Sequence, residues 1–597
     1  MVTQVTLGNF FNVNGRNVLG GIGGSGLDTE SLIDGIIAAR RAPAEQYEDQ
    51  VTQNGKISSA LSEFRSLLSA YQASVDVLRN PPGVGNEAQN VFKYRTATAT
   101  ASDGTASANY VTVTAAPGAT VQNYTIDSIE QLATYASQTT GTITADDANA
   151  SVTTAGATAG KFKAGTITIN DQEITLDVDD SLNEIASKFN AVSANTGINV
   201  TVIKIADEQY QLAFKATATG DDADFDLDDL DIDPDGVFAG VNLAAAVGAQ
   251  NAQFYFNGIP TLIERQSNAV DDLINGMTFN LRGVYNTANL PNSKISVAVE
   301  PDTTLAQNSV VNFILAYNNL REFAVKQTQL NSDGTYAEDS VLANNQTFVT
   351  TMNNITSQIT TKVAGLSLLS SLSDIGISFT TKPADGEIPE IGNILTTDDA
   401  KLSSALASNF EGVAELFGFN MTSNSTELKV YSAPKSLAVI DFTLNINPDD
   451  EEFTVSYDLG DGEGTQMVDL EWTELPDVGY TLTGPAGSAI EDLVFIYGST
   501  DAAEIEVTAT QGIAALAYNS SEGATEANDG TIAVEMERLK DNDTKLQEDI
   551  AEIDQQVNQY RELLISQFAA LEKVIAQVNS LLQSLSANDD ARIAANS

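Results

Sequence analysis

The chain has 597 residues, more than one hydrophobic core usually holds, so several domains are expected. It contains no cysteine and no histidine, which excludes thiol nucleophiles, Ser-His triads, disulfides and the common zinc ligand sets. The 29 basic residues stand against 81 acidic ones, and a net charge of -52 argues against partners such as nucleic acid and anionic membranes.

Targeting signals are also missing from the sequence. No apolar run approaches the ~20 residues of a membrane span, so no membrane insertion is expected. The N-terminus lacks the basic start, apolar stretch and cleavage site of a secretory signal. Because a chain without cysteine suits a secreted protein, we expect secretion by another export route.

The N-terminal region combines a glycine-rich start with helical periodicity. Glycine at the density of 1–26 opposes a stable helix, so this end is predicted to be mobile until it binds a partner. A helix is expected to begin at Asp28 as its N-cap and to stop or bend before Pro43. We assign 1–42 as a flexible and helical leg. Its apolar stripe consists of Leu32, Ile33, Ile36 and Ile37.

A heptad seam follows, in which apolar residues recur at alternating steps of four and three. The seam consists of Ile57, Leu61, Phe64, Leu68, Tyr71, Val75 and Leu78. The sequence Asn80-Pro81-Pro82-Gly83 ends it, because proline cannot continue a helix. We assign 43–91 as an N-terminal coiled-coil helix.

In the middle of the chain the spacing of apolar residues changes from the helical period to the alternation typical of strands. Alternating runs such as VTVTA, TITIN and MTFNLRGV predict β-rich head domains over 92–302, with a small module at 160–220. Within this module Leu182, Ile185, Ala186 and Phe189 indicate one short helix. Helical spacing returns over 303–420, and strand patterns return in a second β insertion over 437–525. The Gly/Ser/Asn-rich stretch 519–530 is predicted to be a linker.

The C-terminal end repeats the heptad signal over a longer stretch. Its seam consists of Ile532, Met536, Leu539, Leu546, Ile550, Ile553, Val557, Tyr560 and Leu564. After a stutter, the stripe continues with Phe568, Leu571, Ile575, Val578, Leu582 and Leu585. We assign 529–564 as a C-terminal coiled-coil helix and 565–597 as a C-terminal leg. An amphipathic helix on a globular core is the alternative for either stripe alone, but two matching stripes predict termini that meet each other or other subunits.

Motifs that could carry chemistry are weak. The sequence Asp231-Ile232-Asp233-Pro234-Asp235-Gly236 copies the opening of a calcium loop, but Asn242 stands where a bidentate Glu is required, so a solvated acidic loop is favoured. Turn chemistry accounts for Asp458, Asp461 and Glu463. The GGIGGSG run follows no strand, and Trp472 is interpreted as a core residue. We predict no catalytic residue, no cofactor and no metal.

Several segments carry a family resemblance. The sequence GIGGSGLDTESLIDGIIAARRAP, followed by the heptad helix and its Pro-terminated end, resembles the N-terminal region of the flagellar filament-capping family, also called hook-associated protein 2. FNGIPTLIERQSNAVDDLINGMTFNLRGV, NFILAYNNL and DGTIAVEMERLKDNDTKLQEDI are similar to later parts of that family, in the same order. The stretch GTITINDQEITLDVDDSLNEIASKFNAV resembles a module inserted in flagellins and caps. The insertion at 437–525 departs from the family pattern.

The resemblance implies an α+β multidomain protein, with terminal helices forming a coiled-coil leg domain and β-rich head domains inserted between them. It implies a non-enzymatic cap at the distal tip of the bacterial flagellar filament, exported by the flagellar type III system, that promotes folding and polymerisation of exported flagellin and prevents its loss. The implied partners are a homo-oligomeric ring, commonly of five subunits, flagellin, the hook-filament junction protein and a cytoplasmic export chaperone. The alternatives are flagellin or a junction protein, or a secreted adhesin that binds host or surface glycans.

Two zones of contact follow from this hypothesis. The pairing of 47–78 with 532–564 is expected to be a permanent inner coiled coil. The outer parts, residues 1–42 and 565–597, are expected to bind and release the filament. The helix-packing and oligomer contacts are assigned to Ile57, Leu61, Phe64, Leu68, Tyr71, Ile550, Ile553, Val557 and Leu564. The filament-binding legs are assigned to Leu32, Ile33, Ile36, Ile37, Phe568, Leu571, Ile575 and Val578.

Overall fold

The computed structural model describes residues 10–13, 16–19, 29–83, 89–227, 236–286, 294–385, 389–476 and 478–595. The fold is α+β, as the sequence predicts. The chain forms two compact units. The first comprises Met1–Arg79, Ser309–Leu402 and Glu415–Ser597, and the second comprises Asn80–Asn308 and Ser403–Ala414.

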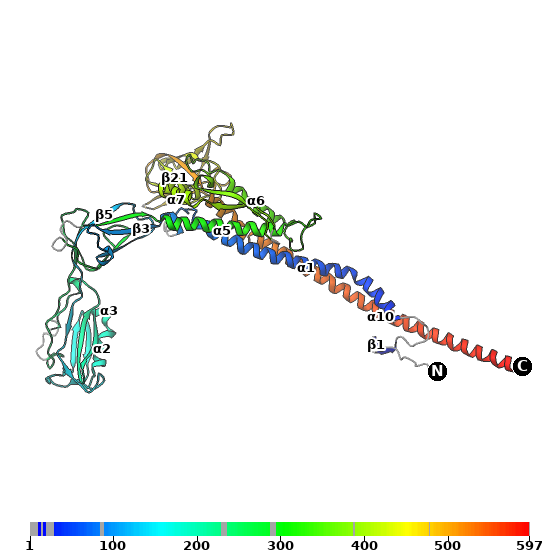
Figure 1. Ribbon diagram of the computed structural model, residues 1–597, viewed down its shortest axis with the longest axis horizontal. Helices are drawn as coiled ribbons and strands as arrows, with labels where there is room; N and C mark the ends of the chain where they lie inside the picture. The colour runs from blue at the N-terminus through cyan, green and yellow to red at the C-terminus, as the bar shows by residue number, and fades with distance from the viewer. Residues whose placement is uncertain are drawn as a thin grey trace. The chain divides into compact units, whose positions relative to one another are not determined.

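The first unit contains the long terminal helices, which run side by side (Figure 1). Its helices are α1 (Thr29–Asp76), most of α5 (Thr303–Gln327), α6 (Gln346–Thr360), α9 (Ile513–Thr525) and α10 (Thr531–Ala595). α1 ends just before the Asn80-Pro81-Pro82-Gly83 sequence, where Asn80 and Gly83 adopt positive φ angles. The predicted stop signal is therefore confirmed.

Pro43 lies inside α1, so the expectation that the helix stops before it is wrong, and the alternative of a bend there stays a prediction. The domain boundary drawn between 42 and 43 likewise falls within one continuous helix. An interior proline removes one backbone hydrogen bond and costs roughly 3 kcal/mol. Side-chain packing offsets this cost, because Ala44 is fully buried and Arg41, two residues before Pro43, forms an ion pair with Asp554 of α10.

The glycine-rich start is described only in part. β1 (Phe10–Val13) and β2 (Arg16–Leu19) pair as an antiparallel hairpin with Phe10 opposite Leu19. The expectation that no strand precedes the GGIGGSG run is therefore wrong, because β2 ends directly before it. The rest of this segment, including the GGIGGSG run and the expected N-cap Asp28, lies outside the described residues. Its predicted mobility stays a prediction.

The first unit also holds a β-sandwich. Its strands are β21 (Phe419–Ser423), β22 (Leu428–Ser432), β23 (Asp441–Asn447), β24 (Glu452–Tyr457), β25 (Gln466–Asp469), β26 (Glu471–Leu475), β27 (Gly479–Thr483), β28 (Val494–Tyr497) and β29 (Ala503–Gln511). They form two antiparallel sheets, ordered β21-β29-β23-β24-β25 and β22-β28-β27-β26. Phe442 of one sheet meets Phe495 of the other in a shared core, with ring centroids 6.1 Å apart.

The sandwich differs from the predicted insertion at both ends. Its strands begin at Phe419 rather than near 437, and residues 513–525 form helix α9 rather than strand or linker. The stretch resembled a linker because it is rich in small residues. Those small residues permit close helix packing, and Ala514, Ala517 and Ser521 are fully buried.

The helical segment predicted over 303–420 contains a hairpin as well. β19 (Ile377–Lys382) pairs with β20 (Ile391–Thr397), and α7 (Asp399–Ser408) and α8 (Phe410–Phe417) follow. Helix α5 anchors the hairpin, because Asn318 exchanges two hydrogen bonds with the backbone of Leu395, of 2.8 Å and 2.7 Å.

The second unit contains two β-rich bodies. In the first, the sheets are ordered β15-β14-β5-β18-β3 and β16-β17-β4 and enclose Phe254, Phe279 and Tyr285. The strands are β3 (Arg95–Ala101), β4 (Val111–Ala115), β5 (Asn123–Gln131), β14 (Ala252–Phe256), β15 (Ile263–Arg265), β16 (Ala269–Val270), β17 (Met277–Leu281) and β18 (Ile295–Pro301).

The other body surrounds a core of Phe162, Phe189 and Phe214. Its strands are β6 (Ser137–Thr139), β7 (Ile143–Thr144), β8 (Thr153–Thr154), β9 (Phe162–Lys163), β10 (Gly165–Ile169), β11 (Gln172–Leu176), β12 (Ile198–Ala206) and β13 (Gln209–Ala216), and its helices are α2 (Leu182–Ala191) and α3 (Ser193–Thr196). The predicted short helix is α2. Its four expected apolar residues are all buried.

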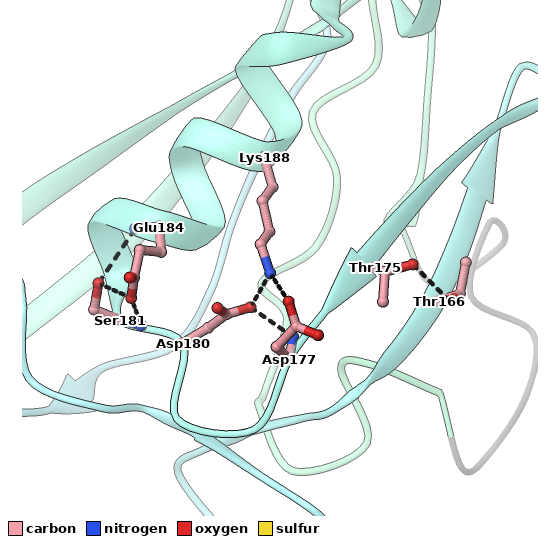
Figure 2. A network of polar contacts seen from close by, with 7 residues as sticks. All are labelled: Thr166, Thr175, Asp177, Asp180, Ser181, Glu184 and Lys188. Carbon is pink, nitrogen blue, oxygen red and sulfur yellow. Dashed lines mark hydrogen bonds and ion pairs between the residues drawn. The ribbon is translucent and has the colours of Figure 1, made fainter.

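A polar network fixes the start of α2 (Figure 2). Ser181 and Glu184 form a capping box that satisfies the first backbone N–H groups of the helix. One turn later, the Lys188 ammonium lies 2.6 Å from both Asp177 and Asp180. Helix α2 is thereby tied to the turn that joins it to strand β11.

Candidate assembly interface

The predicted contact residues lie on α1 and α10, which pair in antiparallel fashion. Thr29 donates a hydrogen bond to Glu572 at 2.9 Å, near the start of α1. Farther along α1, Asn54 donates to Asp543 at 2.7 Å. Because the residue number in α10 falls as that in α1 rises, the two chain ends run in opposite directions over these contacts.

The distal half of this pair, α1 residues 29–57 against α10, has a small apolar core. Ile33 packs with Leu564 and Ile565, and Ile37 and Phe568 lie at the edge of this cluster. Polar contacts surround it. The Arg40 guanidinium lies 4.3 Å from the centroid of the Tyr560 ring. Ion pairs join Arg561 to Asp34 and Arg41 to Asp554, each at 2.8 Å.

Arg41 connects three parts of this region. Besides Asp554, it binds Glu48, which lies on the far side of Pro43 in the same helix. Arg41 donates hydrogen bonds to Glu48 and to Asp554. These bonds, that to Glu48 the most, raise the pKa of its guanidinium above the usual value. Arg41 therefore supports α1 across the proline and fixes its alignment with α10.

The proximal half of α1, residues 61–76, packs differently. Phe64 contacts Phe348 of α6 with ring centroids 4.9 Å apart and stacks on Phe323 of α5. Tyr71 meets Phe313 of α5 at 6.0 Å. Arg65 donates a hydrogen bond to the carbonyl of Thr525 at the end of α9. The seam is thus the core of a multi-helix bundle.

The predicted pairing of 47–78 with 532–564 holds only in part. Asn54 bonds to Asn542 and Asp543 within it, but from Phe64 onward α1 packs against α5, α6 and α9. The heptad spacing shows that one face of each helix is buried, but it does not identify the partner helix. Aromatic side chains at Phe64 and Tyr71 need more volume than a two-helix seam provides, and α5 and α6 supply it.

The structure buries most of the predicted packing residues to different degrees. Leu61, Phe64, Leu68 and Tyr71 are fully buried, Val557 and Leu564 nearly so, and Ile57, Ile550 and Ile553 are half-buried. Among the predicted leg residues, Ile33 is buried, and Ile37, Phe568 and Ile575 are half-buried. Leu32, Ile36, Leu571 and Val578 are exposed.

The part of α10 beyond its contact with Thr29, here called the overhang (residues 573–595), carries an exposed apolar stripe. Its exposed members are Val574, Val578, Leu581, Leu582 and Leu585, and Leu571 adjoins them. Sequence reasoning had missed Val574 and Leu581, which lie three or four residues from seam positions and widen the same face. No charged residue occurs from Val574 to Asn588, although the whole chain carries a net charge of -52.

Tyr71 presents a buried polar group at the centre of the bundle. Its hydroxyl has no hydrogen-bond partner among the described residues, and its side chain is fully buried. Burial raises the pKa of this phenol far above its ordinary value, because the charged form would lose its hydration.

The other candidate chemistry does not form a site. In the turn after β24, Asp458 accepts a hydrogen bond from the N–H of Gly460 at 2.8 Å, and Asp461 accepts one from Glu463 at 2.9 Å, as turn chemistry predicts. The acidic loop predicted at 231–236 lies outside the described residues except for its last position. Within the described ranges, no cluster of three acidic residues is placed to hold a metal ion.

Two further findings concern surfaces. Trp472, interpreted from the sequence as a core residue, is 38% exposed and lies at the edge of the sandwich, where its ring meets Phe453 at 4.7 Å. Among the helices that the structure describes, none is long and apolar enough to cross a membrane.

Comparison with known families decides the assignment. The family described as flagellar hook-associated protein 2 C-terminus matches residues 249–580, which is more than half of the chain, and its N-terminus counterpart matches 25–136. The chain belongs to the flagellar hook-associated protein 2 family. The flagellin hook IN motif matches 161–218, which contains the polar network of Figure 2. The resemblance seen in the sequence is thereby confirmed.

Individual relatives agree with this assignment. The A-type flagellar hook-associated protein 2 of Pseudomonas aeruginosa is 26% identical over 447 residues, covering 69% of this chain and 81% of the relative. The Escherichia coli K12 hook-associated protein 2 is 27% identical over 406 residues, covering 66% of this chain and 78% of the relative. The hook-associated protein 2 family forms the flagellar filament cap, so capping is the function of this chain, and the alternatives of flagellin, junction protein or adhesin are not supported.

Solved structures of cap proteins are similar as well. The D1-D2-D3 domains of the Escherichia coli flagellar cap protein FliD share 24% sequence identity, with a TM-score of 0.41, over 60% of this chain and 89% of that one. The Pseudomonas aeruginosa PAO1 FliD shares 24% identity, with a TM-score of 0.27, over 38% of this chain and 99% of that one.

Proposed function

We propose that this cap binds the end of the flagellar filament through the overhang and the distal half of the α1/α10 pair, and that it promotes folding and polymerisation of exported flagellin and prevents its loss. The observation that supports this role is the exposed apolar stripe of the overhang, which lies in the uncharged stretch 574–588. Contiguous exposed apolar surface of this kind marks sites of protein interaction.

The stripe suits a reversible contact. Fully burying one Val or Leu side chain contributes about 1.5–3 kcal/mol, so a few of them bind a partner helix without any covalent step. The absence of charge from 574 to 588 keeps the stripe itself from repelling an acidic partner. A contact of this type can form and break as subunits are added.

Further features belong to the same proposal. The cap is an oligomeric ring, with five subunits as the working number, and acts without catalysis. It reaches the distal tip by flagellar type III export, with a cytoplasmic chaperone, and meets the hook-filament junction protein before flagellin is added. The helix contacts assigned from the sequence hold the terminal helices of each subunit in place within this assembly.

A pair of charged substitutions tests the role of the stripe. Val578→Asp with Leu582→Asp places two carboxylates on the stripe, and Ser580→Asp with Gln583→Asp places two on the opposite face of the same helix. We expect both variants to keep the wild-type circular dichroism, since all four side chains are exposed. We expect flagellin polymerisation at the filament tip, followed by electron microscopy, to be lost only in the first. Equal activity of the two variants would contradict the proposal.

A further inference from the structure

A cleft of about 550 Å³ lies in the first unit, where α10 passes between α1 and the start of α6. Its apolar lining, here called the apolar floor, consists of Ile57, Val341 and Leu539. Six of its lining residues carry amide side chains, which is an unusual concentration of one chemical group. They are Gln50, Asn54, Asn344, Asn345, Gln346 and Asn542.

Some of these amides hold the cleft together. Asn345 caps α6 by accepting a hydrogen bond from the N–H of Phe348 and donates to Glu535 of α10 at 3.1 Å. Asn54 donates to both Asn542 and Asp543. These bonds connect all three elements, so the cleft is built by the fold.

Other amide groups have no assigned role in the fold. Gln50 and Asn344 are exposed and make no side-chain hydrogen bond to any residue that the structure describes. The same holds for the carboxamide nitrogen of Asn542, which leaves a donor beside the apolar floor. Each free amide offers one acceptor and two donors.

The cleft is also close to electrically neutral. Arg538 and Glu535 are the only two charged residues that line it. They form an ion pair through two hydrogen bonds, of 2.8 Å and 2.7 Å. These hydrogen bonds lower the pKa of Glu535 and keep the pair ionised. A charged ligand therefore finds no unpaired partner here.

We propose that this cleft binds an extended, uncharged stretch of polypeptide through its backbone. A peptide backbone alternates N–H donors and C=O acceptors, which carboxamides match in both senses. Recognition of the backbone is tolerant of sequence, as binding of an unfolded chain requires. The ligand is then the exported flagellin subunit before it folds, an identification that rests on the proposed function.

The test uses the full-length chain and a fluorescein-labelled peptide of twelve Gly, Asn, Ser and Ala residues as the probe. Gln50→Ala with Asn344→Ala removes two free amides from the cleft. Gln53→Ala with Asn353→Ala removes one Gln and one Asn that are exposed outside it. We expect fluorescence anisotropy to show binding about tenfold weaker in the first variant, from two lost hydrogen bonds, and unchanged binding in the second. A peptide with N-methylated amides should not bind.

Three results would overturn the inference. They are no binding of the probe to the wild-type chain at millimolar concentration, equal binding to both double variants, or binding only of a peptide copied from residues 20–27, which would assign the cleft to a second copy of this chain. Tip polymerisation of flagellin is measured in parallel. If polymerisation is normal but the probe does not bind, only the proposal that the cleft binds peptide is overturned. If no cap-dependent polymerisation occurs, the proposed function is overturned.

Discussion

The two halves of α1 have the same apolar periodicity but pack against different partners. The proximal half is buried by aromatic residues of α5 and α6, with Phe64 and Tyr71 fully inaccessible to solvent. The distal half is covered mainly by α10, through a small cluster around Ile33 and several exposed ion pairs, and meets residues 338–347 only near Lys56 and Ile57. A bundle core and an exchangeable contact are therefore built from the same kind of sequence pattern.

The largest expected effect concerns the bundle core. Phe64→Ala removes a fully buried ring and should lower the free energy of unfolding by about 3–5 kcal/mol. The distal Ile36→Ala, at a 39% exposed side chain, should change it by no more than about 0.5 kcal/mol. Urea denaturation followed by helical circular dichroism measures both. Similar values for the two variants would remove the distinction between the halves.

An intermediate effect is expected at the distal cluster. Leu564→Ala takes most of one buried side chain from a cluster that has few members, at a cost of about 2 kcal/mol. The loss should be local. Amide hydrogen exchange should accelerate in residues 30–42 and 558–572 and stay unchanged in 61–75. Acceleration across the whole of α1 would show that the two halves unfold together.

A smaller effect is expected from pH at Tyr71. Burial raises its pKa in the folded state above the unfolded value of about 10, so its contribution to stability is complete below pH 10 and is lost as the pH rises further. The loss amounts to at most about 1.4 kcal/mol for each pH unit above 10. Tyr71→Phe should be at least as stable as the wild type in urea denaturation at pH 8, because the hydroxyl has no partner to lose, and should exceed it by a wider margin at pH 10.8. No difference at the higher pH would place the phenol in contact with water.

The smallest effect is expected at Arg41. Arg41→Met keeps the aliphatic part of the side chain and removes the ion pairs with Asp554 and Glu48, both partly exposed. Stability should fall slightly at low salt, and the difference should shrink in 1 M NaCl, because salt screens exposed charges. The readout is the thermal midpoint of the helical signal at the two salt concentrations. A difference that does not depend on salt would indicate packing rather than charge.

Local features of the fold were predictable from the sequence where short-range chemistry decides them. The end of α1 follows from Asn80-Pro81-Pro82-Gly83, and α2 follows from four apolar residues at helical spacing. The partner of each buried face was not predictable, because periodicity carries no information on which helix lies opposite. Pro43 and the small-residue helix α9 were not predictable either, because tertiary packing overrides local helix preference at both places.

The candidate interface was predictable to a similar extent. The exposed stripe of the overhang could be anticipated at Leu571 and Val578, which occupy seam positions, but Ile33 and Phe568 were expected to bind the filament and instead contact the partner helix. The amide-lined cleft has no sequence signature, because its residues come from three segments far apart in the chain.

Pro43 leaves one backbone carbonyl oxygen of α1 without its usual hydrogen-bond donor. Because proline has no N–H, the carbonyl oxygen of Ala39, one turn earlier, receives no hydrogen bond from that position, and Ala39 is exposed. This oxygen is a backbone acceptor on the outside of an otherwise saturated helix. Because Ala39 is exposed, water can reach this oxygen, so the turn before Pro43 offers a backbone acceptor that the rest of the helix interior does not.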